Sequence, residues 1–120
     1  MNTDSNDQGR LTTHVLDTAN GTPAAGMQID LYKIDQTNKE LVLTIKTNHD
    51  GRADKPLMEG SAFQEGYYEL VFHVGKYFGR SEDISFLDEV PIRFGINNAG
   101  EHYHVPLLVS PFSFSTYRGS

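Results

Sequence analysis

Cysteine is absent from the 120-residue sequence. Its absence excludes a disulfide framework, a thiolate metal site and a cysteine nucleophile, and it leaves the redox compartment open. Basic residues are also few, since 10 Lys and Arg stand against 16 Asp and Glu, for a formal net charge of -6 at pH 7. A protein without a basic stripe is a poor candidate for binding nucleic acid or an anionic membrane surface.

Long hydrophobic runs are lacking as well. No stretch approaches the ~18 apolar residues of a membrane helix, and the polar opening MNTDSNDQGR has no apolar core of signal-peptide length. We therefore expect a cytoplasmic protein with a disordered lead-in at residues 1–9. With 38% hydrophobic content in the chain, residues 10–120 suffice for one domain, which buries about two thirds of the surface that its unfolded chain exposes.

What the sequence does contain is a series of short segments in which side-chain character alternates with a period of two. These segments are rich in β-branched and aromatic residues, and turn sequences such as NGTP, NHDGR and NNAG separate them. They occupy residues 11–17, 27–34, 41–47, 67–74, 91–96, 102–109 and 112–117. The pattern predicts an all-β antiparallel two-sheet sandwich, with one short helix within residues 75–90, where the alternation lapses.

The segment HYHVPLLV has two chemically different faces. The apolar face, which we expect to enter the core, carries Tyr103, Val105, Leu107 and Val109. The opposite face carries His102, His104, Pro106 and Leu108. A hairpin at residues 110–111 sets this face beside the serines and Tyr117 of the last strand. The apolar half of the histidine-bearing face, Pro106 and Leu108, predicts that this face is buried against another subunit.

Two histidines at i and i+2 share one strand face, so a zinc site formed by His14, His102 and His104 is one alternative. No Asp or Glu with ligand-like spacing accompanies them, which makes the pattern a weak signal for a metal. His49 and His73 have no partner motif, and we expect them to be structural or exposed.

Four segments taken together resemble one known family. They are HVLDTANGTPAAGMQIDLYK, DGR, EHYHVPLL and the closing YRGS, in this order. DGR alone is a common turn, but the combination is similar to the 5-hydroxyisourate hydrolases, the transthyretin-like enzymes of urate degradation. The resemblance spans nearly the whole chain after residue 10.

This resemblance implies a transthyretin-like (prealbumin) two-sheet sandwich with a short helix. It also implies a homotetramer, a dimer of dimers with active sites at the subunit interface around a central channel. The implied reaction is hydrolysis of 5-hydroxyisourate to 2-oxo-4-hydroxy-4-carboxy-5-ureidoimidazoline, without a metal or another cofactor. The implied site consists of His14, Arg52, His104 and the terminal residues Tyr117 to Ser120.

The residue types suit the hydrolysis of a cyclic amide. A neutral imidazole, with an ordinary pKa of ~6.5, can deprotonate water. The planar fork of Arg52 can hold a substrate that carries adjacent carbonyl oxygens. On the resemblance, the catalytic residues are His14, Arg52, His104 and Ser120, with His14, Arg52 and Tyr117 binding substrate. Which histidine is the base stays open.

The main alternative is a transthyretin-like protein that binds small hormone-type ligands without catalysis, because the fold alone does not separate binding from hydrolysis. Transthyretin lacks the first-strand histidine, the channel histidine of HYH and the terminal YRGS, whereas this sequence has all three. A purely structural sandwich would leave the His, Arg and Tyr constellation without a role. The sequence therefore favours the hydrolase.

Overall fold

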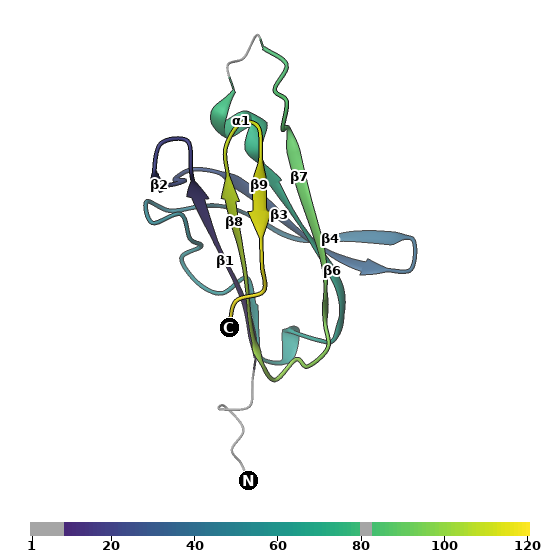
Figure 1. Cartoon of the computed structure of the whole chain (residues 1–120). Coiled ribbons are helices and arrows are strands. Elements are labelled where there is room, and N and C mark those ends of the chain that lie inside the picture. The colour runs from purple at the N-terminus through teal and green to yellow at the C-terminus, as the bar shows by residue number, and fades with distance from the viewer. Residues whose placement is uncertain (1–8, 80–82) are drawn as a thin grey trace.

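The computed structural model describes residues 9–79 and 83–120. Within them, two β-sheets pack face to face, as the alternating pattern predicts (Figure 1). One sheet contains β1 Arg10–Asp17, β2 Thr22–Pro23, β5 Met58–Glu59, β8 His102–Val109 and β9 Phe114–Thr116. The other contains β3 Gln28–Asp35, β4 Asn38–Lys46, β6 Gly66–His73 and β7 Glu89–Ile96. The predicted lead-in, residues 1–9, lies outside the described residues except for Gly9.

The core lies between the two sheets and is built from one face of each strand. Side chains with no exposed surface include Leu11, Val15, Ile29, Leu31, Leu70, Phe72, Leu107 and Val109. The apolar face expected for residues 102–109 is confirmed as the core face, since its four side chains are at most 8% exposed. Each large apolar side chain that is fully buried contributes roughly 1.5–3 kcal/mol. This burial determines which face of every strand points outward.

β1 and β8 form a parallel pair in a sandwich that we expected to be antiparallel throughout. The chain builds the whole second sheet between these two strands, and a crossover of that length allows β8 to run in the same direction as β1. The register sets Thr12 opposite His104 and His14 opposite Pro106. The outward side chains of the two strands therefore form neighbouring rows.

The expected short helix is present as α1 Val74–Phe78, directly after β6. It begins one residue before the expected range 75–90, at Val74, which the alternating pattern assigns to the preceding strand. Residues 80–82 of that segment lie outside the described part, and a 3-10 turn, η2 Gly60–Ala62, follows β5. The Tyr77 hydroxyl donates to the carboxylate of Asp17 over 2.9 Å and so ties α1 to the end of β1. Burial and this bond raise the pKa of Tyr77 to about 12. In the described ranges, no helix is long and apolar enough to cross a membrane.

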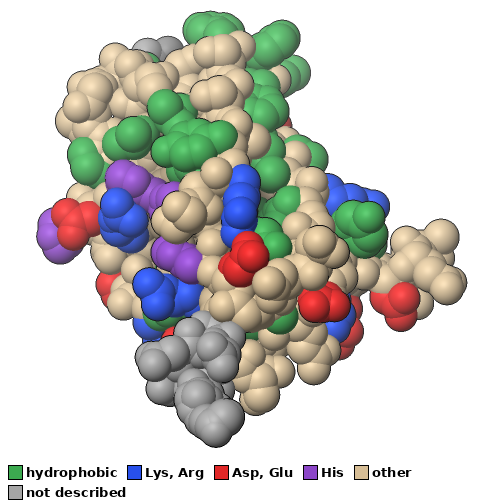
Figure 2. Space-filling model, turned by 60° about the horizontal axis from the view of Figure 1, so that its bottom comes forward, with side chains coloured by type: hydrophobic (Ala, Val, Ile, Leu, Met, Phe, Trp, Pro, Cys, Tyr) green, Lys and Arg blue, Asp and Glu red, His purple; other side chains and the backbone are tan. Residues whose placement is uncertain are grey.

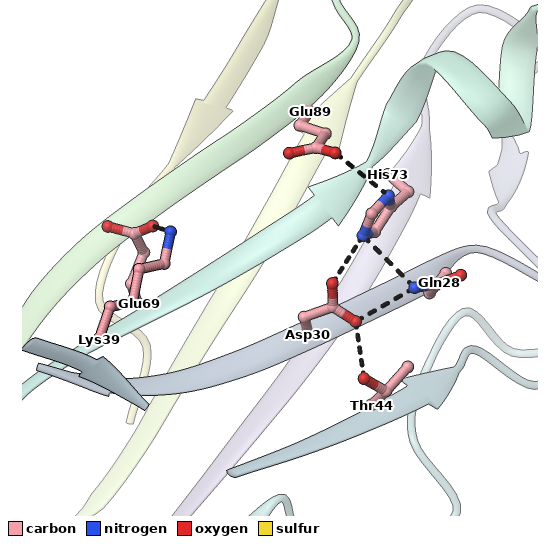
Figure 3. Close-up of polar contacts among 7 residues, drawn as sticks. All are labelled: Gln28, Asp30, Lys39, Thr44, Glu69, His73 and Glu89. Carbon is pink, nitrogen blue, oxygen red and sulfur yellow. Dashed lines mark hydrogen bonds and ion pairs between the residues drawn. The ribbon is translucent and has the colours of Figure 1, made fainter. Parts of the chain in front are cut away.

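The second sheet carries a separate polar cluster on its outward face (Figure 3). His73 Nε2 lies 2.8 Å from Asp30 Oδ2, and His73 Nδ1 lies 3.9 Å from Glu89 Oε2. His73 and Asp30 are only 9% and 8% exposed, so His73 is a buried, paired histidine that links β3 to β6. His49, in contrast, is exposed beside Asp50.

Candidate functional site

Histidine side chains gather on the outward face of the five-stranded sheet (Figure 2). His14 comes from β1, whereas His102 and His104 come from β8. The ring centroids of His14 and His104 are 6.5 Å apart, and those of His102 and His104 are 6.3 Å apart. All three side chains are half-buried. The parallel pairing of β1 with β8 therefore unites histidines from the two ends of the chain.

The DGR turn brings Arg52 to His14. The side-chain oxygen of Asn48 accepts a hydrogen bond from the Arg52 N–H over 3.1 Å, which closes the turn. Gly51 has a φ of 77°, and its carbonyl accepts the Val15 N–H over 2.8 Å. A Cβ at Gly51 would clash with the Val15 carbonyl oxygen, so glycine both permits the turn and lets it approach β1. Arg52 consequently forms an antiparallel bridge with His14.

The C-terminal segment continues alongside β8 beyond β9 and reaches His104. The Gly119 N–H donates to the His104 carbonyl over 2.7 Å, and the His104 N–H donates to the Gly119 carbonyl over 3.2 Å. Arg118 anchors the segment in two ways. It forms an ion pair of 2.8 Å with Glu101, and its guanidinium carbon lies 4.1 Å from the ring centroid of Tyr103 in a cation–π contact. The end of the chain is therefore ordered against the histidine face.

The outward face changes from polar to apolar along β1 and β8. Leu16 pairs with Leu108, and Pro106 lies between Leu108 and His104 in β8. Leu108 also pairs with Ser115, so the histidine face continues onto the last strand, as the hairpin predicts. Figure 2 shows hydrophobic side chains directly beside the histidines. This outward face thus combines polar groups with an apolar flank.

Two predicted site residues remain apart from the others within the single chain. Tyr117 is 60% exposed, and Ser120 is exposed as well. In the described part of the chain, neither side chain forms a hydrogen bond or ring contact with the histidines or with Arg52. The structure therefore brings together His14, Arg52 and His104, and it brings the backbone of the terminal segment to them.

Thr12 is a residue of this face that the sequence reasoning missed. Its Oγ1 lies 2.8 Å from Nε2 of His102 and 2.8 Å from Nδ1 of His104. The available signal was its position two residues before His14, which places both on the same strand face. Threonine is common in strands, so that position alone did not single it out.

The surroundings of the histidines favour the uncharged imidazole. Burial, followed by the positive charge of Arg52, lowers the pKa of His14. The same two causes, together with the neighbouring histidines, lower the pKa of His104. Burial and two nearby arginines lower the pKa of His102. These shifts favour the neutral imidazole at all three positions, the form that can act as a base or accept a hydrogen bond.

The zinc alternative requires the three histidines to direct nitrogen atoms at one point. Instead, the Thr12 hydroxyl forms hydrogen bonds with Nε2 of His102 and with Nδ1 of His104. Over residues 9–79 and 83–120, no group of three or more His, Cys, Asp or Glu is arranged so that it could hold a metal ion.

Known proteins resemble this chain over most of its length. 5-Hydroxyisourate hydrolase 2 of Rhizobium meliloti (strain 1021) is 59% identical over 116 residues, which are 93% of this chain and 97% of the relative. The structure of Klebsiella pneumoniae 5-hydroxyisourate hydrolase has a TM-score of 0.78 at 33% identity and covers 93% of this chain and 99% of that chain. (S)-allantoin synthase has a TM-score of 0.87 at 50% identity over 94% of this chain, which spans only 44% of that longer chain.

Sea bream transthyretin in complex with thyroxine has a TM-score of 0.81 at 23% identity and covers 92% of this chain and 94% of that chain. At this identity the likeness shows the fold alone, and it confirms the transthyretin-like sandwich that the sequence predicts. Residues 11–119 match the HIUase/Transthyretin family. Because this match covers nearly every residue that builds the two sheets and the site between β1, β8 and the DGR turn, the chain belongs to the HIUase/Transthyretin family.

Proposed function

We propose that this protein hydrolyses 5-hydroxyisourate to 2-oxo-4-hydroxy-4-carboxy-5-ureidoimidazoline in urate degradation. The observation that carries the proposal is the grouping of His14, Arg52 and His104. The backbone of Arg52 forms a β-bridge with His14, the Arg52 charge acts on both imidazoles, and the two rings are 6.5 Å apart. The 59% identity to a protein named 5-hydroxyisourate hydrolase supports it.

Ring opening by water needs a base for the water and a donor for the oxyanion that develops on the carbonyl. In our proposal an imidazole, that of His14 or His104, accepts the water proton. Burial and Arg52 lower the pKa of both histidines, which keeps them in the basic form. Arg52 is exposed, and its charge acts on both imidazoles. In our proposal its fork grips the carbonyl oxygens of the heterocycle and stabilises their negative charge.

We further propose that Tyr117 binds substrate and that Ser120 orients the water. The backbone bonds between Gly119 and His104 support this role, because they carry the neighbouring residues to the histidine face. Tyr117 is 60% exposed in the single chain, and the face that it adjoins has an apolar flank. Exposure of such an apolar flank to water is unfavourable, so covering by another subunit would stabilise it. We therefore propose a homotetramer, a dimer of dimers, in which this face lines a channel between subunits.

The test generates 5-hydroxyisourate from urate with urate oxidase and follows its ultraviolet decay. Added protein should accelerate the decay well beyond the spontaneous rate. Arg52→Lys keeps the charge but loses the fork, and it should lower kcat/KM by on the order of 10- to 100-fold. The matched control is Arg93→Lys, because Arg93 belongs to β7 of the other sheet and pairs with Glu69. Unaccelerated decay combined with tight binding of thyroxine-like ligands would establish the binding alternative.

Two further measurements on the same sample separate the remaining alternatives. Exhaustive chelation should leave the rate of hydrolysis unchanged. If chelation abolished the activity and added zinc restored it, the zinc site at the three histidines would be established. Light scattering should report four chains per particle. A fully active monomer would contradict the proposed channel between subunits.

A further inference from the structure

The hydroxyl of Thr12 lies between two histidine rings on the outward face of the five-stranded sheet. Its Oγ1 is 2.8 Å from His102 Nε2 and 2.8 Å from His104 Nδ1. A hydroxyl carries one proton, so when both rings are neutral it donates to one of these nitrogens and accepts an N–H from the other. The tautomers of His102 and His104 are therefore coupled, because a change in one ring requires a change in the other.

Two arrangements satisfy both hydrogen bonds. In the first, His104 donates its Nδ1–H to Thr12, and Thr12 donates to His102 Nε2, which leaves His104 Nε2 without a proton and able to act as a base. In the second, His102 donates its Nε2–H to Thr12, and Thr12 donates to His104 Nδ1. His104 Nε2 then carries the proton and can act as an acid. Reversal of the two bonds thus converts His104 from a base into an acid.

The strand register holds these three side chains in place. Thr12 stands opposite His104 in the parallel pair of β1 and β8, and His102 is two residues earlier on the same face of β8. All three side chains are half-buried, and β-branched Thr12 has a restricted choice of rotamers. The backbone pairing and the restricted rotamers therefore hold the hydroxyl between the two rings.

Resting on the hydrolysis proposed above, we propose that Thr12 and His102 are positioning residues that relay a proton to and from His104 during turnover. His104 takes a proton from water at Nε2 as the water oxygen bonds to the ring carbonyl carbon. The Nδ1 proton of His104 then moves to Thr12 Oγ1, and the hydroxyl proton moves to His102 Nε2. The reverse transfer lets His104 deliver a proton from Nε2 to the nitrogen released when the ring C–N bond breaks. No proton is gained or lost over the cycle.

The charged groups around the two rings determine where the proton rests. They are Arg10 and Arg118 at His102, and Arg52 and His14 at His104. Burial and its two arginines lower the pKa of His102, while Glu101, 2.8 Å from Arg118, offsets one of those cations. A positive charge on His102 is therefore short-lived, which favours return of the proton within the same turnover.

The first test reads the tautomers directly and needs no substrate. Thr12→Val removes the hydroxyl while keeping the shape, and Thr12→Ser restores a hydroxyl. Thr13→Val is the matched control, because the Thr13 hydroxyl also joins β1 to β8, through the Val105 carbonyl at 2.8 Å, but on the core side. In ¹⁵N spectra of the imidazoles, we expect Thr12→Val alone to change the tautomers of both His102 and His104. Unchanged tautomers in Thr12→Val would overturn the coupling.

The second test is kinetic. Thr12→Val and His102→Gln should each lower kcat, with KM nearly unchanged, by on the order of 10- to 100-fold. Glutamine keeps a hydrogen-bond partner for Thr12 but cannot accept a proton. Thr12→Ser and Thr13→Val should retain most of the rate and the wild-type pH profile. Wild-type rates and an unaltered pH profile in Thr12→Val and His102→Gln would overturn the relay. If the wild-type protein does not accelerate decay of 5-hydroxyisourate, the proposed function fails, and the spectra still decide whether the coupling exists.

Discussion

Gly119 and His104 exchange two backbone hydrogen bonds, of 2.7 and 3.2 Å, at the very end of the chain. A Cβ at position 119 would lie 3.1 Å from both Cβ and Cδ2 of His104, so any residue other than glycine would press on the His104 side chain. Thr12 holds the opposite side of the same ring through Nδ1. His104 is therefore fixed between the first strand and the last residues of the chain.

We expect Gly119→Ala to lower activity with little loss of stability. The added methyl group forces the His104 ring to give by a few tenths of an ångström. Since a displacement of ~1 Å can cost a hundredfold in rate, this shift should cost on the order of tenfold in kcat/KM. The free energy of unfolding in urea should change by about 1 kcal/mol or less. Ser113→Ala, in the same hairpin, is the control, and a fully active Gly119→Ala protein would show that this contact does not position the ring.

Removal of residues 117–120 should abolish most activity and preserve the fold. The segment lies outside the core, and its ion pair between Arg118 and Glu101 joins side chains that are each 49% exposed, which contributes little to stability. Calorimetry should show the melting midpoint lowered by less than about 8 °C. The ultraviolet assay should show kcat/KM lowered by about a hundredfold or more. A folded, truncated protein that retains its turnover would contradict the roles proposed for Tyr117 and Ser120.

Gly51 and Gly21 provide a matched pair for testing the DGR turn. Both have positive φ, of 77° and 70°, but a Cβ on Gly21 meets nothing within 4 Å, whereas one on Gly51 meets the Val15 carbonyl. Gly21→Ala should destabilise by about 1 kcal/mol through its backbone conformation alone. Gly51→Ala should destabilise by about 2–4 kcal/mol and move Arg52 away from His14, with a loss of activity that Gly21→Ala does not share. If Gly51→Ala and Gly21→Ala changed the free energy of unfolding and the activity equally, the close approach of the DGR turn to β1 would have no importance for the site.

Activity should persist to a lower pH than an ordinary histidine base allows. Burial and Arg52 lower the pKa of His14 and His104, and the base must be neutral to take a proton from water. kcat/KM should therefore be level above about pH 6.5 and fall only below that value. The coupled histidines titrate as a set, so the profile reports their joint behaviour. A rate that already falls between pH 8 and 7 would contradict a lowered pKa, and a rate that does not fall at any acidic pH at which the protein stays folded would contradict a histidine base.

The same pKa shifts make the free energy of unfolding depend on pH. Histidines of the unfolded chain titrate near ~6.5, whereas burial and nearby arginines lower the pKa of His102 in the folded protein. The unfolded chain binds more protons between those two values, so stability is full above about pH 6.5 and decreases as the pH falls below it. Urea unfolding between pH 8 and 5 should show this decrease, and His102→Gln should make it smaller. An identical pH dependence in the variant would show that His102 does not contribute.

The sequence predicted the strands and their faces because alternation with a period of two is a local property. The alternation in HYHVPLLV separated Tyr103 and Val105 from His102 and His104, and the structure keeps that separation. The resemblance carried by HVLD, DGR, HYH and YRGS supplied the candidate residues. Of these, His14, Arg52 and His104 lie together, while the roles of Tyr117 and Ser120 stay predictions.

Tertiary structure alone decided which residues from the two ends of the chain meet. The parallel register of β1 and β8 places the Thr12 hydroxyl between His102 and His104, and no local pattern encodes this, because it depends on how the chain returns after building the second sheet. The approach of Gly119 to His104 has the same origin. By itself the sequence determined which side chains point outward, and through-space pairing of distant strands determined which of them form hydrogen bonds with one another.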